Sequence, residues 1–67
     1  MNLAETFGRN VRIRREAAGL SQEDLADAAK IHVTYLSGVE NGKRNATLKI
    51  VERISKALGS RASDLLA

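Results

Sequence analysis

Residues 21–42 read SQEDLADAAKIHVTYLSGVENG, in which two short helical patterns lie on either side of a turn. The first pattern covers residues 22–29. Ser21 before it is a good N-cap, and acidic residues in its first turn favour the positive end of the helix dipole. The second pattern covers residues 33–41 and ends at Gly42. Residues 30–32 must turn the chain between the two, and this spacing is typical of a helix-turn-helix.

The side chains of this segment divide into an inner and an outer face. Small Ala26 and Ala29 allow the two helices to approach closely, and Ile31 is an apolar plug for their shared core. The other residues expected to point inward are Leu25, Ala28, Leu36 and Val39. Those expected to point outward from the second helix are Thr34, Ser37, Gly38 and Asn41. A helix held in this way can protrude into a groove about 12 Å wide.

The rest of the chain predicts three more helices and no strand, hence an all-α domain of five helices spanning residues 1–67. They should cover residues 3–18, 48–58 and 62–66, with Thr47 as an N-cap and Gly19 and Gly59 as ends. Asn41-Gly42 resembles a hairpin turn, but its helix-periodic left flank favours a helix end. The expected core stripes are Leu3, Phe7 and Val11 in the first helix and Leu48, Val51, Ile54 and Leu58 in the fourth, with Leu65 entering from the fifth.

Two glycines, Gly8 and Gly38, fall inside helical patterns. Each costs roughly 1 kcal/mol relative to alanine in a helix interior. A glycine in such a position often has a packing reason.

Composition excludes several classes of protein. The 67 residues include no cysteine, so a disulfide framework or thiolate metal site is ruled out, and a reducing cytoplasm is the expected location. No apolar run of 18 residues is present to span a membrane. The single histidine, His32, has no partners at metal-ligand spacing, and the carboxylates Glu23, Asp24 and Asp27 suit a helix start better than acid–base chemistry. We therefore expect no cofactor, no metal and no enzymatic activity.

Charge is distributed unevenly around a net value of +3. Basic residues gather within residues 9–15 and again within residues 43–61, while residues 23–40 are mainly acidic. This pattern is compatible with a polyanionic partner, and equally with solvated helix faces.

Several runs resemble the lambda-repressor/Cro-like family of bacterial and phage regulators. They are GLSQEDLA at 19–26, YLSGVENGKR at 35–44, Thr47-Leu48 and ISKALG at 54–59. Within that family, TYLSGVE at 34–40 and Arg44-Asn45 are similar to the controller proteins of restriction–modification systems. The resemblance implies a sequence-specific transcription regulator that binds operator DNA in the major groove.

The resemblance also assigns roles to positions. Residues matching base-reading positions or lying close to them are Val33, Thr34, Tyr35, Ser37 and Gly38. Controller proteins often carry arginine where Val33 stands, and valine favours thymine over guanine because it offers only apolar contact. The alternative is that Val33 only occupies the N-terminus of the helix and contacts no base. Tyr35 either donates its hydroxyl to DNA or lies partly in the core.

Phosphate contacts are implied for a second set of residues: Ser21, Gln22, Asn41, Lys43, Arg44 and Asn45. The alternative for Gln22 is that it is only an N-terminal helix residue beside the cap. The alternative for Lys43, Arg44 and Asn45 is that they are only the solvated residues of a turn. Arg15 and Glu40 match a structural ion pair that joins the first and third helices.

Family members usually dimerise, which places two reading helices about 34 Å apart on DNA. Ile50, Ala62 and Leu66 are the residues expected at a two-fold contact, although Leu66 could simply close the core. Such a dimer on a near-palindromic operator would exclude or recruit RNA polymerase. The alternative is an antitoxin or protein-interaction module, because one fold serves several functions. The chain stops directly after the last helix, as expected either for a short regulator or for one domain of a longer protein.

Overall fold

Five helices make up the protein in a computed structural model, which describes residues 2–67. In chain order they are α1 (Leu3–Ala17), α2 (Gln22–Ala29), α3 (Val33–Glu40), α4 (Leu48–Leu58) and α5 (Ala62–Leu65). No strand occurs within the residues described. The prediction of an all-α fold is confirmed, and α2 and α4 have the predicted bounds.

The other three helices end one residue earlier than predicted. The residues concerned, Ala18, Asn41 and Leu66, still donate their backbone N–H groups into the last helical turn. Their ψ angles are −3°, 3° and 1°, well away from the roughly −42° of a regular α-helix, and each of the three residues is a C-cap.

Gly59 is the C-cap of α4, and Gly19 and Gly42 directly follow the C-caps of α1 and α3, so the three glycines lie at the predicted helix ends. Gly19, Gly42 and Gly59 have φ angles of 73°, 73° and 66°, which place them in the left-handed region. Asn41-Gly42 is therefore a helix end, and the hairpin alternative is wrong. Lys30 ends α2 with a φ of 60°, where its Cβ is strained by about 1 kcal/mol.

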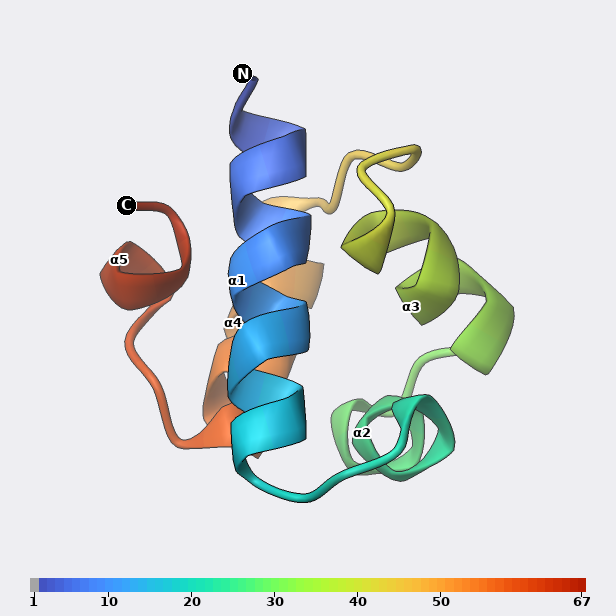
Figure 1. The fold of residues 1–67 in the computed structure, drawn as a ribbon. Helices are drawn as coiled ribbons and strands as arrows, with labels where there is room; N and C mark the ends of the chain where they lie inside the picture. Colours follow the sequence, from blue (N-terminus) through green and yellow to red (C-terminus); the bar gives the residue numbers. More distant parts are fainter. Residues whose placement is uncertain (1) are drawn as a thin grey trace.

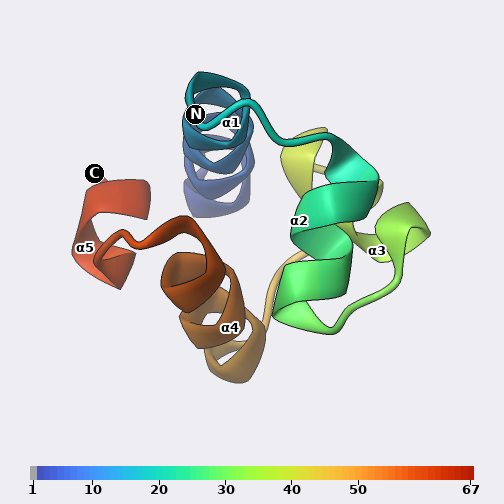
Figure 2. The same cartoon turned by 90° about the horizontal axis from the view of Figure 1, so that it is seen from below.

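The other four helices lie on one side of α1, whose opposite face is exposed to solvent. Figure 1 shows α1 upright in the centre, with α2 and α3 to its right, α5 to its left and α4 behind. Figure 2 shows the same arrangement from below. Helix α1 packs against α3 and α5, and α2 packs against α3 and α4. As a result α3 lies at one edge of the molecule, with one long face free.

The core consists of one cluster to which every helix contributes. Its members are Phe7, Val11, Leu25, Ala26, Ala29, Leu36, Val39, Val51, Ile54 and Leu65. Leu58 packs against this cluster but is only partly buried.

Three residues predicted to be buried are not. Leu3 is 62% exposed and Leu48 is 87% exposed, because each lies in the first turn of its helix and the core begins further along. Ala28 is exposed as well. Successive residues are about 100° apart around a helix, so a face centred on Leu25, Ala26 and Ala29 turns Ala28 to solvent.

Candidate nucleic-acid interface

The turn between α2 and α3 is fixed by backbone hydrogen bonds. The N–H of Ile31 donates to the carbonyl of Ala26 at 2.9 Å, and the N–H of Lys30 donates to that of Asp27 at 3.2 Å. This pair of bonds is a Schellman closure, which requires the left-handed conformation seen at Lys30. Ile31 is half-buried and packs against the core, which confirms its predicted place as a plug. The direction of α3 relative to α2 is thereby set.

Two contacts join α3 to α1. At Gly8 the helices meet without an intervening side chain: a Cβ there would overlap the carbonyl oxygen of Val39 and lie 3.0 Å from that of Glu40. Seven residues further along α1, the buried side chain of Arg15 forms an ion pair with the buried side chain of Glu40 in α3. The packing reason expected for Gly8 is therefore found.

The ion pair is bidentate and lies within a small polar network. Arg15 donates from Nε to Glu40 Oε2 at 2.7 Å and from Nη2 to Oε1 at 3.0 Å. Its Nη1 donates to the carbonyl of Leu20 at 2.8 Å. Hydrogen bonding to Glu40 raises the pKa of Arg15 above its usual value. The predicted architectural role of the pair is thus supported by its geometry, which holds α1, the loop before α2 and the end of α3 together.

The outer face of α3 carries the side chains proposed to read bases. Val33 and Thr34 are exposed, whereas Tyr35, Ser37 and Gly38 are half-buried. The only charged residue of α3 is Glu40, and it is buried. The surface that α3 presents to solvent is therefore uncharged and carries small groups.

A basic loop is bound to this face. The N–H groups of Lys43 and Arg44 both donate to the carbonyl of Gly38, at 2.9 and 3.2 Å. The guanidinium carbon of Arg44 lies 5.9 Å from the centre of the Tyr35 ring. The Tyr35 hydroxyl donates to the carbonyl of Asn45 at 3.4 Å. Tyr35 thus supports the loop, a role that sequence reasoning missed.

Gly38 has a packing reason of its own. A Cβ at this position would lie 2.7 Å from Cγ of Arg44, so the side chain of Arg44 occupies the space that a larger residue would need. The absence of a side chain at Gly38 lets the stem of Arg44 lie across α3. The sequence offered a glycine inside a helical pattern as the only signal for this contact.

The start of α2 lies beside the end of α3. Ser21 is the predicted N-cap: its hydroxyl oxygen accepts from the N–H of Asp24 at 3.0 Å, and its own N–H donates to the Asp24 carboxylate at 3.0 Å. These bonds hold the pKa of Asp24 below its ordinary value of 3.8. Gln22 donates from Nε2 to Oε1 of Glu40 at 3.0 Å. The amide of Gln22 is therefore engaged within the protein.

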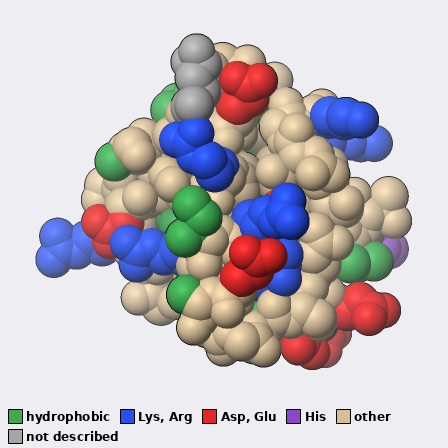
Figure 3. Space-filling view, viewed as in Figure 1, with side chains coloured by type: hydrophobic (Ala, Val, Ile, Leu, Met, Phe, Trp, Pro, Cys, Tyr) green, Lys and Arg blue, Asp and Glu red, His purple; other side chains and the backbone are tan. Residues whose placement is uncertain are grey.

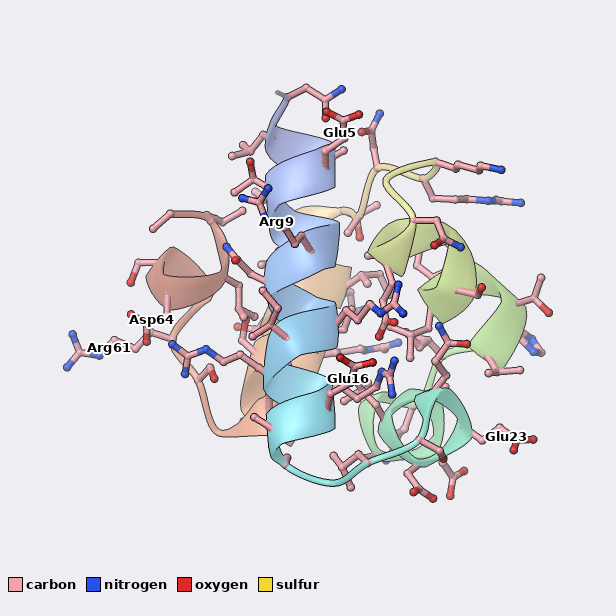
Figure 4. All side chains as sticks on the ribbon, viewed as in Figure 1. Glu5, Arg9, Glu16, Glu23, Arg61 and Asp64 are labelled. Atoms are coloured by element: carbon pink, nitrogen blue, oxygen red, sulfur yellow. The ribbon has the colours of Figure 1, made fainter. Side chains whose placement is uncertain are left out.

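The two basic regions of the sequence do not form two basic patches. Arg15 is buried, Arg12 pairs with Glu16 at 3.4 Å, and Arg14 donates to Ser60 at 3.2 Å. In Figure 3 acidic side chains gather over α2, and basic side chains project from the loop that follows α3. Figure 4 shows Arg61 projecting from α5, on the opposite side of the molecule from α3. The basic residues are therefore spread over several surfaces, and the loop that follows α3 places Lys43 and Arg44 beside its outer face.

An apolar hollow of about 170 Å³ lies between the start of α1 and the start of α4, and Asn45 of the basic loop lines part of it. Leu3, Phe7, Leu48, Val51 and Leu66 supply most of its apolar lining. Of the predicted dimer residues, Leu66 lines the hollow and Ala62 lies in an adjoining one with Leu48. Ile50 is half-buried against the core. Sequence reasoning missed Leu48 because its helical position predicted burial.

Residues 2–67 offer little for other kinds of site. None of their helices combines the length and the hydropathy needed to cross a lipid bilayer. Within the same range, no group of three metal-binding side chains comes together. His32 is the N-cap of α3 by position, and its side chain makes no capping hydrogen bond.

Comparisons with known proteins agree with this geometry. A family model described as helix-turn-helix matches residues 11–65. The chain is 47% identical over 66 residues to the control protein C.BamHI of Bacillus amyloliquefaciens, covering 97% of this chain and 82% of that protein. It is 39% identical to the control protein C.SmaI of Serratia marcescens, covering 98% and 79%.

Solved structures give the same result. The restriction-modification controller protein C.AhdI from Aeromonas hydrophila superimposes with a TM-score of 0.89 at 37% identity, covering 92% of this chain and 94% of that one. The names of these proteins describe control proteins, so they do not favour the antitoxin alternative.

Proposed function

Because the chain belongs to the helix-turn-helix family of the lambda-repressor and Cro type, and is a DNA-binding regulator of transcription, we propose that it controls a restriction–modification system. It would do so in the cytoplasm, by binding operator DNA rather than by catalysis, and so exclude or recruit RNA polymerase. One observation carries the proposal. The outer face of α3 is uncharged, and the basic loop that follows the helix is hydrogen-bonded to the Gly38 carbonyl. The helix that would read bases and the loop that would bind phosphates are therefore fixed relative to each other.

The proposed contacts divide into two kinds. Base edges would be read from α3, by Val33 and Thr34 in its first turn and by Ser37 and Tyr35 further along. Gly38 would act through Arg44, since it provides the space in which that side chain lies. Phosphates would be bound on either side of the groove, and the residues for this are Ser21, Gln22, Asn41, Lys43, Arg44 and Asn45. Gln22 would either leave Glu40 to do so or bind through its remaining polar groups.

Two variants test this division. Thr34→Ala should weaken binding to the preferred operator by about 1 kcal/mol and leave non-specific binding unchanged, because base contacts carry the sequence information. Arg44→Ala should weaken all duplexes alike and reduce the slope of log affinity against log salt by about 0.9, because one phosphate contact is lost. Fluorescence anisotropy titrations at several salt concentrations would measure both.

The matched control is Arg61→Ala, which removes an exposed cation on the opposite side of the molecule. It should bind as the unmodified protein does, apart from a small loss due to net charge. Equal losses on every duplex for Thr34→Ala and Arg44→Ala would contradict the proposed roles.

We also propose that the working form is a dimer, formed where the apolar hollow meets its copy. Leu48 is 87% exposed, an unusual position for a large apolar side chain, and Leu3 beside it is 62% exposed. In a two-fold contact, Leu48 of each chain could enter the hollow of the other, next to Leu66 and Ala62. This surface extends the predicted contact of Ile50, Ala62 and Leu66 toward the start of α4.

Leu48→Asp is the test of the dimer. The change should weaken self-association at least about tenfold, since a central apolar anchor is replaced by a charge. The fold should survive, because the side chain is exposed and an acidic residue suits the first turn of a helix. Sedimentation equilibrium would measure the association. Ile13→Asp is the control, because Ile13 is also exposed, at 55%, but lies in a different hollow with Leu58; equal dimer affinities in the two variants would contradict the proposed interface.

A further inference from the structure

The first turn of α3 presents an apolar side chain that is partly exposed to solvent. Val33 is the first residue of α3 and is 38% exposed, and it is not a member of the core cluster or of the residues packed against it. It caps nothing, since the cap position belongs to His32. Part of the Val33 side chain is therefore accessible to a partner, at the start of the helix expected to enter a DNA groove.

The surroundings of Val33 do not suit a phosphate. The hollow that it borders is also lined by Glu23, Asp24 and Asp27 of α2, and no lysine or arginine takes part in the lining. The carboxylates beside Val33 repel phosphates, and a valine side chain has no group that can bind one, so Val33 suits an apolar group on a base rather than the DNA backbone. Thr34, the next residue, is exposed as well and carries both a hydroxyl and a methyl group.

Base chemistry then limits what Val33 can recognise. In the major groove guanine presents two acceptors, adenine an acceptor and a donor, and cytosine a donor, and none of these can pair with a valine side chain. Thymine is the exception, because its C5 methyl group is apolar and projects into the major groove. Contact between that methyl group and the methyl groups of Val33 removes apolar surface from water on both sides.

We propose that Val33 determines specificity by recognising the C5 methyl group of a thymine in each operator half-site. The inference rests on the proposed entry of α3 into the major groove and names the chemistry read at its first position. A 5-methylcytosine carries its methyl group at the same place, so the same contact accepts it. The protein thereby senses a C5 methyl group on the pyrimidine, whichever pyrimidine carries it.

Modified duplexes test the proposal directly. Preferred sites are first selected from a random duplex library with the unmodified protein. Each thymine of the half-site is then replaced by deoxyuridine, which removes only the methyl group. We expect one thymine at which this replacement weakens binding about fourfold, the ratio that corresponds to one apolar carbon withdrawn from a contact. At that position cytosine should bind weakly, and 5-methylcytosine should recover about the same factor.

Protein variants assign the effect to Val33. In Val33→Ala the difference between thymine and deoxyuridine at that position should fall well below fourfold, because the shorter side chain keeps only its Cβ methyl group for the contact. In Thr34→Ser, which removes a methyl group but keeps the hydroxyl, the fourfold difference should remain. Val33→Ala should fold normally, because the site is exposed and alanine is the better helix former. Melting curves followed by circular dichroism verify this.

The outcomes separate the inference from the function on which it rests. A protein that binds no duplex at low salt contradicts the proposed function itself. A protein that binds a selected operator but shows no loss with deoxyuridine leaves the function intact and overturns the inference. A methyl effect that keeps its full size in Val33→Ala, or that disappears in Thr34→Ser, also overturns it, because the methyl group is then read by another side chain.

Discussion

Gly8→Ala is expected to destabilise the protein by about 3 kcal/mol, although the change is a single methyl group in a helix. Alanine favours helix over glycine by roughly 1 kcal/mol, so the intrinsic effect is stabilising. The packing effect opposes it and is larger. The added Cβ would overlap the carbonyl oxygen of Val39 and lie 3.0 Å from that of Glu40, and both atoms belong to the backbone of α3. Helix α3 must therefore move as a body away from α1, which opens the packing that positions it.

The measurement is thermal unfolding followed by circular dichroism. A domain of this size has a total stability of roughly 3–10 kcal/mol, so the variant should melt roughly 10–25 °C lower or be partly unfolded at 25 °C. Operator affinity should fall with it, because α3 loses its fixed position.

Gly38→Ala is the matched control, since it is the same change inside another helix. The added Cβ would meet Cγ of Arg44, at 2.7 Å, and a flexible side chain can move aside where a backbone cannot. We expect a melting temperature close to that of the unmodified protein, together with weaker DNA binding because Arg44 is displaced. If Gly8→Ala melted no lower than Gly38→Ala, the close approach of α1 and α3 would be contradicted.

The helices could be predicted from the sequence because their signals are local. Ser21 and Thr47 each accept a hydrogen bond from a backbone N–H three residues further along, so residue type and spacing alone identify the caps. Gly19, Gly42 and Gly59 lie at helix ends in the left-handed conformation, which glycine adopts readily because it has no side chain. The inward positions of Leu36 and Val39 follow from helical periodicity, and all of these predictions are confirmed.

Predictions that depended on the neighbouring elements were less successful. Leu48 has the correct periodicity for the core stripe of α4, yet no other helix covers it, and the sequence does not show where the neighbours end. The hydrogen bond from Gln22 to Glu40 and the position of Arg44 over Tyr35 join residues 18 and 9 positions apart. Such contacts depend on the angle between α2 and α3 and on the path of the loop, which periodicity does not determine.

The ion pair of Arg15 and Glu40 was predicted from resemblance, and its geometry supports a second large effect. Glu40→Ala is expected to destabilise the protein by about 3–5 kcal/mol, because the guanidinium of Arg15 would remain largely buried without its counter-charge. The side chains of Arg15 and Glu40 are 10% and 1% exposed, so solvent screens the pair little. Gln22 would lose its acceptor at the same time. Urea unfolding should show a lower midpoint with little change in slope.

The stability of Glu40→Gln should lie between that of the unmodified protein and that of Glu40→Ala, because glutamine keeps an acceptor for Arg15 and loses only the charge. The decisive comparison is the double variant Arg15→Met with Glu40→Leu. If the cost of Glu40→Ala arises from an uncompensated buried charge, removing both charges should restore part of the stability, because apolar groups of similar size can replace a buried pair. Some loss should remain, since the carbonyl of Leu20 and the amide of Gln22 no longer have their partners. A double variant less stable than Glu40→Ala would mean that these polar contacts, rather than the charge, hold α3 against α1.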